Sequence, residues 1–403
     1  MIRLSGVDFV QIAYARQNLS KLSSALTCSQ FLHPCLCYFT PAGFCLSEGK
    51  NIIMKKIVCF HLYNDFSGSP KVLRQVVRGM LEEGHEVVLV TSRNGILDNS
   101  QFIIHNSQLT FRQYNYKFAG SGVVTALRYV WVQVYTFFVA LGYLFEKDVV
   151  FYINTILPVG PAVAGWLMRK RVIYHYHENA MVKGRMYRAL AWVMQRVATE
   201  IICVSEYQRS FLKRQEGVKV VPNALDEEFL ARAVVDVEGA FERKTVLMLG
   251  SLKGYKGTKE FVELARRLEQ YRFVLVLNDE QENIDRYFEE NGLVVTENLK
   301  VYARQEDVVP FYREASVVLN LTDKTQAIET FGLTALEARA FGLPVIVPTV
   351  GGIAEMVEDG VNGWKIDVQE LDVIAMRIEE MLSDREVYER LCRGCLRSNI
   401  GRT

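Results

Sequence analysis

The sequence predicts an α/β protein with two Rossmann-like, doubly wound parallel-sheet domains that face each other across a cleft. Three observations lead to this prediction. Short apolar runs of strand length alternate with amphipathic helical patterns along most of the 403 residues. The alternation occurs in two series, which are separated by a polar stretch near 225–243. The length, at roughly 150 residues per domain, agrees with two or three domains.

The first series opens with a strand at 57–61, followed by a polar loop and an amphipathic helix. Ser69 is expected to cap the N-terminus of this helix, with Pro70 at its first position. Gly84 is expected just after its end. Further apolar runs predict strands at 86–91, 148–153, 171–175 and 200–204.

The second series repeats this pattern, with a helix at 260–269 and strands at 245–249, 273–277, 299–302, 317–321 and 344–347. Ligands of doubly wound sheets bind beyond the carboxyl ends of the strands, so the site is expected between the domains. The pattern divides the chain into five parts. These are an extension outside the fold (1–53), a first domain (54–224), a linker (225–243), a second domain (244–388) and a short tail (389–403).

Residues 1–53 differ from the rest, because Asp8 interrupts the region that would be apolar in a signal peptide. A targeting or Cys/His segment is one interpretation. The preferred interpretation is a start codon assigned too early, with Met54 as the natural beginning. The eight cysteines are scattered, and Cys392-x-x-Cys395 has no second pair for a zinc site. Reduced thiols and a cytoplasmic location are therefore expected.

The charges are nearly balanced, with 47 Lys and Arg against 46 Asp and Glu. With a hydrophobic content of 50%, this argues against a disordered chain and a generally basic nucleic-acid-binding protein, so no nucleic-acid partner is expected. Residues 112–196 are nevertheless basic, with eleven Lys or Arg and three acids, Glu146, Asp148 and Glu178. This region is expected to contact an anionic membrane peripherally, on the cytoplasmic side.

The run 123–145 is apolar except for Arg128 and Gln133. It is long enough to span a membrane, but an arginine near the middle of a span costs about 2.5–3.5 kcal/mol on insertion scales. A helix packed in the domain is the preferred interpretation. A helix on the membrane surface and a true span are the alternatives.

Several chemistries are disfavoured because their motifs are absent. The sequence has no G-x-x-x-x-G-K-[ST] loop, no G-x-S-x-G elbow and no H-E-x-x-H helix. It also has no two aspartates two positions apart, which is the spacing of a common metal site. No metal ion and no cofactor are expected.

Glu329 and Glu337 mark the most informative stretch, because a helix is expected to begin between them, near Phe331. The first backbone N–H groups of a helix, here at 331–334, have no intrahelical acceptor and form an anion site. Such a helix could hold a diphosphate, with one carboxylate on each side for hydroxyl groups. The alternative is that Glu329 is a loop acid and Glu337 a solvated helix residue.

Other motifs accompany this Glu-x7-Glu pair. Gly-Leu-Pro-Val stands at 342–345, Gly-Gly-Ile-Ala-Glu at 351–355, Val-Pro-Asn-Ala-Leu-Asp at 221–226, and a loop at 250–257 ends in Lys-Gly. Together these motifs resemble the retaining glycosyltransferases of family 4, which have the two-domain GT-B fold. The resemblance extends from Met54 to about residue 384.

The resemblance implies that a nucleotide-diphosphate sugar binds mainly to the second domain. Lys256 would contact the diphosphate, Glu329 the transferred sugar and Glu337 the ribose. The implied catalytic residues are His177, Lys256 and Glu329. The implied donor-binding residues are Ser67, Gly68, Ser69, Lys253, Lys256, Asn278, Arg304, Glu329, Thr330, Phe331, Gly332, Leu333, Thr334 and Glu337.

Two features depart from the family pattern. Ser251 stands where relatives have an arginine, so Lys253 is the candidate for the second cation of the diphosphate site. The chain also ends at Thr403, soon after Asp384, where relatives carry a further helix that returns to the first domain.

The expected function is therefore metal-independent transfer of a sugar, with retention of configuration, to an acceptor hydroxyl. The expected acceptor is a lipid-linked glycan in surface polysaccharide biosynthesis. A sugar-nucleotide epimerase of the GT-B fold and a non-catalytic nucleotide-sugar-binding subunit are the alternatives.

Overall fold

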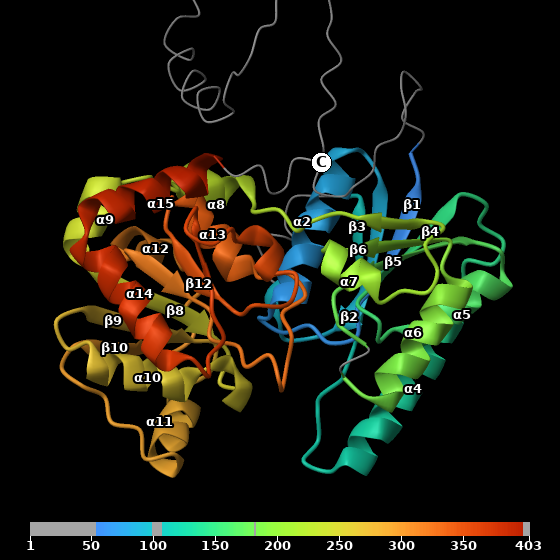
Figure 1. The fold of residues 1–403 in the computed structure, drawn as a ribbon. Coiled ribbons are helices and arrows are strands. Elements are labelled where there is room, and N and C mark those ends of the chain that lie inside the picture. Colours follow the sequence, from blue (N-terminus) through green and yellow to red (C-terminus); the bar gives the residue numbers. More distant parts are fainter. Residues whose placement is uncertain (1–53, 99–106, 181–182, 398–403) are drawn as a thin grey trace, which may run out of the picture. The chain divides into compact units, whose positions relative to one another are not determined.

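The computed structural model describes residues 54–98, 107–180 and 183–397. These residues belong to one compact unit, Thr40–Thr403, and form two parallel sheets (Figure 1). The expectations for 1–53, and those for the last six residues, lie outside the described part of the chain.

The first sheet has seven parallel strands in the order β3-β2-β1-β4-β5-β6-β7. All five predicted strands are present, and β3 and β7 are additional edge strands. The strands are β1 (Lys56–Phe60), β2 (Glu86–Ser92), β3 (Leu109–Tyr114), β4 (Val149–Asn154), β5 (Arg171–Tyr176), β6 (Glu200–Cys203) and β7 (Val218–Val220). The connecting helices are α2 (Gly68–Glu82), α4 (Gly122–Leu141), α5 (Val159–Leu167), α6 (Arg185–Val197) and α7 (Glu206–Ser210), with a 3-10 turn η1 (Ile96–Asp98).

The second sheet has six parallel strands in the order β10-β9-β8-β11-β12-β13. Again all five predicted strands are present, and β13 is additional. The strands are β8 (Thr245–Gly250), β9 (Arg272–Leu277), β10 (Leu299–Tyr302), β11 (Val317–Leu319), β12 (Val345–Val347) and β13 (Gly363–Lys365). The helices are α8 (Glu227–Arg232), α9 (Val237–Arg243), α10 (Thr258–Arg267), α11 (Gln281–Glu290), α12 (Val309–Glu314), α13 (Leu333–Ala340), α14 (Leu371–Ser383) and α15 (Arg385–Arg397), with the 3-10 turns η2 (Gly254–Lys256) and η3 (Ala354–Met356).

Both faces of the first sheet are buried. Along β1, Ile57 and Cys59 belong to the core that α2 covers, whereas Val58 and Phe60 belong to the core that α5 and α6 cover. Successive side chains of a strand point to opposite faces, so a strand with helices on both sides is apolar throughout. This explains why the strands read as continuous apolar runs and confirms the predicted fold class.

The start of α2 differs from the prediction. The N-cap is Ser67, not Ser69, and Pro70 is the third residue of the helix. The hydroxyl and the backbone N–H of Ser67 both donate to Asp65 Oδ1, at 2.5 and 3.0 Å. This turn at Asp65 begins the helix earlier than the proline indicates. Gly84 follows the helix with φ +81°, as predicted.

Two segments outside the expected sheets are helical. Residues 225–243, expected as a linker, contain α8 and α9, and Ala240 and Phe241 of α9 are buried in the core of the second sheet. The expected tail from 389 continues α15 as far as Arg397, with Cys392 buried in the same core. Both segments therefore pack with the second sheet.

The structure contradicts the prediction of a packed helix at 123–145. Only Val132, Thr136 and Ala140 of α4 are buried, while Trp131 is 68% exposed and Phe138 is 64% exposed. Of the described helices, α4 alone is long and apolar enough to cross a membrane. The prediction failed because the helix is apolar on all sides, whereas the domain covers one side only.

Candidate functional site

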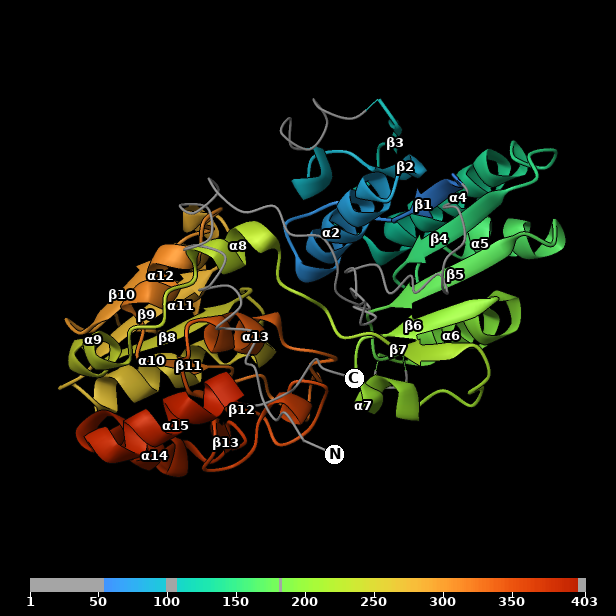
Figure 2. The ribbon, with the colours of Figure 1, turned by 90° about the horizontal axis from the view of Figure 1, so that it is seen from above.

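Several residues of the candidate site follow the carboxyl ends of strands where the strand order reverses. In the first sheet this point lies between β1 and β4, and in the second between β8 and β11 (Figure 2). Gly68 follows β1 and Asn154 ends β4, while Lys256 follows β8 and Glu329 follows β11. Doubly wound sheets bind ligands at such points because the loops on either side diverge there.

Lys256 and Glu329 form an ion pair between Nζ and Oε1. The hydroxyl of Thr322 donates to the same oxygen at 2.8 Å. Lys256 is brought to this position by Gly257, which has φ +77° and packs so closely on Leu321 that a Cβ atom would overlap it. Only glycine fits there, because it combines a positive φ with the absence of a side chain.

The carboxylate of Glu329 is held in its ionised form. Burial alone would raise its pKa, but the charge of Lys256 and hydrogen bonds from Lys256 and Thr322 outweigh that effect. The net pKa of Glu329 is therefore lowered. A carboxylate of this kind accepts hydrogen bonds from hydroxyl groups near neutral pH.

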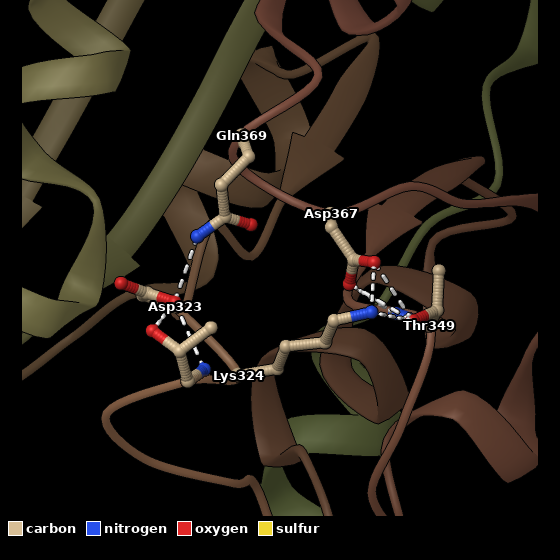
Figure 3. Close-up of polar contacts among 6 residues, drawn as sticks. Asp323, Lys324, Thr349, Asp367 and Gln369 are labelled. Carbon is tan, nitrogen blue, oxygen red and sulfur yellow. Dashed lines mark hydrogen bonds and ion pairs between the residues drawn. The ribbon is translucent and has the colours of Figure 1, made fainter.

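A second set of polar contacts anchors the loop between β11 and α13 that carries Glu329 (Figure 3). Lys324 pairs with Asp367, just beyond β13, and donates to Thr349 Oγ1 at 3.0 Å, just beyond β12. Asp323 accepts a hydrogen bond from Gln369 at 2.8 Å. The loop is thereby tied to the ends of the two neighbouring strands.

The N-terminus of α13 lies beside the glycine loop of the first domain. Gly332 precedes the helix with φ +108°, and a Cβ atom there would overlap Ile353. A Cβ atom on Gly68 would lie 3.4 Å from Leu333 Cδ1. The first N–H groups of α13, from Leu333 and Thr334, have no acceptor within the helix. An anion could accept hydrogen bonds from them.

Glu337 is on α13, and Tyr312 OH donates to its Oε2 at 2.5 Å. Burial raises the pKa of Glu337, and the hydrogen bond from Tyr312 only partly opposes this. Glu337 is thus held by a neutral donor, whereas Glu329 is held by a cation. Glu329 lies in the loop before α13 and Glu337 lies within the helix, so the two glutamates occupy separate positions on either side of the helix start.

Asn278 and Arg304 contact the first-domain loop. Asn278 Nδ2 donates to the carbonyl of Phe66 at 3.2 Å, and Arg304 Nε donates to Asn278 Oδ1 at 3.0 Å. The guanidinium of Arg304 also lies 5.0 Å from the ring centroid of Phe66 and pairs with Glu280. Both residues therefore lie at the junction of the two domains, beyond β9 and β10.

His177 follows β5 and belongs to a buried network. Its Nε2 lies 3.0 Å from Asn154 Oδ1, and the amide nitrogen of Asn154 lies 3.0 Å from His61 Nδ1 and 3.2 Å from the carbonyl of Ser69. The ring centroid of His175 is 4.1 Å from that of His177. Burial, and then the charges of the other two histidines, lower the pKa of His177 well below its ordinary value. The imidazole is therefore neutral at pH 7.

Thr330 joins the two sheets rather than pointing to a free space. Its hydroxyl donates to the carbonyl of His177 at 2.6 Å, and its own carbonyl accepts from Ser205 Oγ at 2.7 Å. Glu355 adds a third link, because it accepts hydrogen bonds from the first backbone N–H groups of α7. Thr330 therefore fixes the backbone of His177 against the loop that carries Glu329.

Lys253, Ser67 and Ser69 make fewer contacts with the other residues of the candidate site. Lys253 is exposed, and its ammonium lies 6.0 Å from the ring centroid of Tyr255, while that of Lys256 lies 5.8 Å from the same ring. Ser67 is also exposed and turns its hydroxyl to Asp65. Ser69 contributes its carbonyl to Asn154.

Three residues of this arrangement had no role in the sequence interpretation. Asn154 positions His177, Tyr312 holds Glu337, and Thr322 holds Glu329. Asn154 had a detectable signal, because it is a polar residue directly after an apolar strand at 149–153. Tyr312 lies on a short helix without any motif, so only the fold brings it to the site.

Two family models match the chain. Glycosyltransferase Family 4 matches residues 66–229, and Glycosyl transferases group 1 matches residues 236–393. Among curated proteins, D-inositol 3-phosphate glycosyltransferase of Paenarthrobacter aurescens is 30% identical over 37% of this chain and 38% of its own length. N-acetyl-alpha-D-glucosaminyl L-malate synthase of Bacillus anthracis is 22% identical over 45% and 48%. The chain spans about half the length, or less, of these curated relatives.

Solved structures resemble the chain over a larger part of its length. HepE from Anabaena, in complex with UDP and glucose, is similar with a TM-score of 0.66 and 18% identity, over 85% of this chain and 94% of that chain. Sucrose-phosphate synthase from Thermosynechococcus elongatus has a TM-score of 0.67 and 17% identity, over 85% and 93%. At this identity the similarity shows the shared two-domain fold.

Proposed function

The chain belongs to family 4 of the glycosyltransferases, with their GT-B fold and nucleotide-sugar chemistry, and on this premise we propose the reaction that it performs. It moves a sugar from a nucleotide-diphosphate sugar to an acceptor hydroxyl. The transfer retains the anomeric configuration and needs no metal ion. The acceptor is a lipid-linked glycan on the cytoplasmic side of a membrane, in surface polysaccharide biosynthesis.

The Lys256–Glu329 pair beside the start of α13 carries this proposal. In the donor complex, Lys256 turns to the diphosphate, and the N–H groups at the start of α13 bind the same anion. A charge pair at about 4 Å is worth on the order of 4 kcal/mol at an effective dielectric near 20. Because a diphosphate carries more negative charge than one carboxylate, it competes with Glu329 for Lys256. Glu329 is then free to accept hydrogen bonds from hydroxyl groups of the transferred sugar.

The positive groups at this position support a reaction without a metal ion. Lys256 and the α13 N–H groups supply positive potential for the leaving diphosphate, and Lys253 is the further cation where Ser251 replaces the usual arginine. Glu337, which accepts a hydrogen bond from Tyr312, binds the ribose hydroxyls on the other side of the helix start in this proposal.

In this proposal His177 binds the transferred sugar from the first domain. Asn154 uses its amide nitrogen for His61 and Ser69, so its oxygen faces His177 and accepts the proton on Nε2. In a neutral imidazole this leaves Nδ1 as an acceptor for a sugar hydroxyl. No protein nucleophile is assigned. The leaving phosphate takes the proton of the acceptor hydroxyl on the same face of the sugar.

The test is a donor titration of the full chain without metal, using UDP-, GDP-, ADP-, CMP- and dTDP-linked sugars. UDP-glucose comes first, because HepE was solved with UDP and glucose. Ligand at a hundred times its dissociation constant stabilises the folded state by about 2.7 kcal/mol, which thermal unfolding detects. We expect stabilisation by one nucleotide family and slow release of free sugar.

Product analysis then separates transfer from the alternatives. An epimerase returns a changed nucleotide sugar without any acceptor, and a binding subunit is stabilised but gives no product. Absence of stabilisation by every donor, in a folded protein, contradicts the proposed function.

A further inference from the structure

One side of α4 presents a continuous apolar stripe to solvent. Val123, Leu127, Val130, Trp131, Val134 and Phe138 follow the spacing i, i+4, i+7, i+8, i+11 and i+15, which places them on one face of a helix. All six are exposed, and Val123, Leu127, Trp131 and Phe138 are 71, 66, 68 and 64% exposed. The stripe is directly opposite the buried residues Val132, Thr136 and Ala140.

Exposed apolar side chains also lie on the two helices that follow α4. In Figure 2, α5 lies between α4 and α6, and contacts join α5 to both of them. Trp166 and Leu167 at the end of α5 are 54 and 58% exposed, and Met186 and Trp192 of α6 are 55 and 61% exposed. We call the exposed side chains of α4, α5 and α6 the α4–α6 face. A face with this much exposed aromatic surface is unusual for a protein without a partner there.

Every charged residue on α4, α5 and α6 is basic. The three helices contain no Asp or Glu. The guanidinium of Arg196 lies 5.3 Å from the ring centroid of Trp192, so cationic and aromatic groups alternate on α6. The exposed basic residues on and beside the helices are Lys117, Arg128, Arg169, Lys183, Arg185, Arg188 and Arg196.

We infer that the α4–α6 face docks on an anionic lipid bilayer, with α4 lying in the interface. The apolar stripe enters the boundary between headgroups and acyl chains, and the basic residues contact lipid phosphates. This rests on the proposed function in one respect, because a lipid-linked acceptor requires the first domain to approach the membrane.

The packing of α4 favours lying on the bilayer over crossing it. Tyr129 OH donates to the carbonyl of Leu157 at 2.8 Å, and the backbone N–H of Gly160 donates to Gln133 Oε1 at 2.9 Å. A Cβ atom on Gly160 would overlap the backbone of Gln133, so the two helices are in close contact. The domain therefore holds one side of α4 from Tyr129 to Ala140, and the opposite stripe is available to lipid.

The charge pattern also favours a bilayer over a second copy of the chain. In a symmetric dimer the same face meets itself, so each basic residue near the axis approaches another basic residue. Such an interface is repulsive at its rim, whereas the same rim complements anionic headgroups.

Vesicle binding of the full chain tests the inference. Vesicles contain 30% phosphatidylglycerol in phosphatidylcholine, or phosphatidylcholine alone, at low and high salt. We expect binding to the anionic vesicles that weakens with salt, and at least about tenfold weaker binding to the neutral ones. Brominated lipid should quench most tryptophan fluorescence, because three of the four tryptophans lie on the α4–α6 face. The fourth, Trp364, is buried in the second domain and serves as an internal reference.

A matched pair of variants locates the contact. Trp131→Ala with Phe138→Ala should reduce vesicle binding at least about tenfold, because the loss of one large apolar side chain from the lipid already accounts for a change of that size. Val294→Ala with Met376→Ala removes two exposed apolar side chains of the second domain and should bind like the wild type. Equal binding by all three proteins overturns the inference. A dimer of the wild type in sedimentation velocity also overturns the inference, if Trp131→Ala with Phe138→Ala abolishes it and Val294→Ala with Met376→Ala does not.

Donor-induced thermal stabilisation, measured without vesicles, separates this inference from the proposed function. Donor stabilisation with no lipid binding contradicts only the docking surface. Lipid binding with no response to any donor contradicts only the proposed function.

Discussion

Glu329 and Glu337 are eight positions apart in one motif, yet their surroundings change their acidity in opposite directions. Both are partly buried, which by itself raises the pKa of a carboxyl group. Lys256 reverses that effect at Glu329, whereas Tyr312 offers Glu337 only a neutral hydrogen bond. Two carboxylates of one motif thus lie in different electrostatic surroundings, one beside a cation and one beside a neutral hydroxyl group.

At this scale we expect Glu329→Gln and Lys256→Met each to reduce the rate of sugar transfer at least about tenfold, or about 1.4 kcal/mol in the barrier. The first loses the anionic acceptor for sugar hydroxyls, and the second loses the cation for the diphosphate. Initial rates at saturating and limiting donor concentrations measure both effects.

The control for this prediction is Glu263→Gln. Glu263 pairs with Arg266 and Arg267 on the surface of α10, and these arginines lower its pKa to about 2. Its removal should leave the transfer rate unchanged.

Lys256→Met should also destabilise the fold, because it leaves Glu329 without its cation. Adding Glu329→Gln should restore stability but not activity. A folded Glu329→Gln protein with the wild-type rate contradicts the assigned role.

At the scale of secondary structure, the start of α13 is shaped by backbone conformation rather than by a side-chain cap. Gly332 is the N-cap residue in a positive-φ conformation, and no side chain caps the helix. Loops tied to the ends of β12 and β13 lead into it. The helix therefore begins with free N–H groups beside the first-domain loop, which a side-chain cap would have occupied.

We expect Gly332→Ala to destabilise the protein by about 1–3 kcal/mol from backbone strain alone. The overlap of the new Cβ atom with Ile353 should add to this loss of stability. The helix start must shift, so donor affinity should fall at least about tenfold. Gly292→Ala is the matched control, since Gly292 also has a positive φ, of +61°, but nothing lies near its Cβ position. It should cost about 1 kcal/mol and leave donor affinity unchanged. Equal donor affinity in both variants would disprove the role of the α13 start.

At the scale of the whole molecule, hydrogen bonds connect the two sheets at the same place where the site residues meet. Thr330 contacts His177 and Ser205, and Asn278 contacts the loop after β1. Two histidines of the first domain near this place are buried, with His61 and His175 only 3 and 4% exposed. Burial lowers the pKa of His61 to about 4 and that of His175 to about 3.

Buried neutral histidines make stability depend on pH. Unfolded histidine binds protons below about pH 6.5. The folded protein resists protonation of His61 until about pH 4. The contribution of His61 is thus complete above pH 6.5 and is lost as the pH falls toward 4. We expect His61 alone to reduce the free energy of unfolding by about 2 kcal/mol between pH 7 and pH 5.

Urea unfolding at pH 7, 6 and 5 checks this prediction. Tryptophan fluorescence reports mainly the first domain, because Trp131, Trp166 and Trp192 lie there. His61→Asn keeps an acceptor near the position of Nδ1 for Asn154 but does not titrate. This variant should lose less stability than the wild type over the same range. The same pH dependence in both proteins would contradict the burial argument.

The sequence by itself determined the two-domain fold, all ten predicted strands and the family. Strand runs, glycine loops and the Glu-x7-Glu stretch depend on residues close together in the chain, so local patterns report them. Those patterns also indicated which residues follow the carboxyl ends of the strands, from Gly68 to Glu329.

Only the tertiary structure decided which partners these residues have and which surfaces remain uncovered. Asn154 and His177, or Tyr312 and Glu337, are more than twenty positions apart, and no local pattern records such contacts. For α4 the sequence showed that the helix is apolar on all sides. Whether a side is buried depends on what packs against it, and the domain covers only the side with Val132, Thr136 and Ala140.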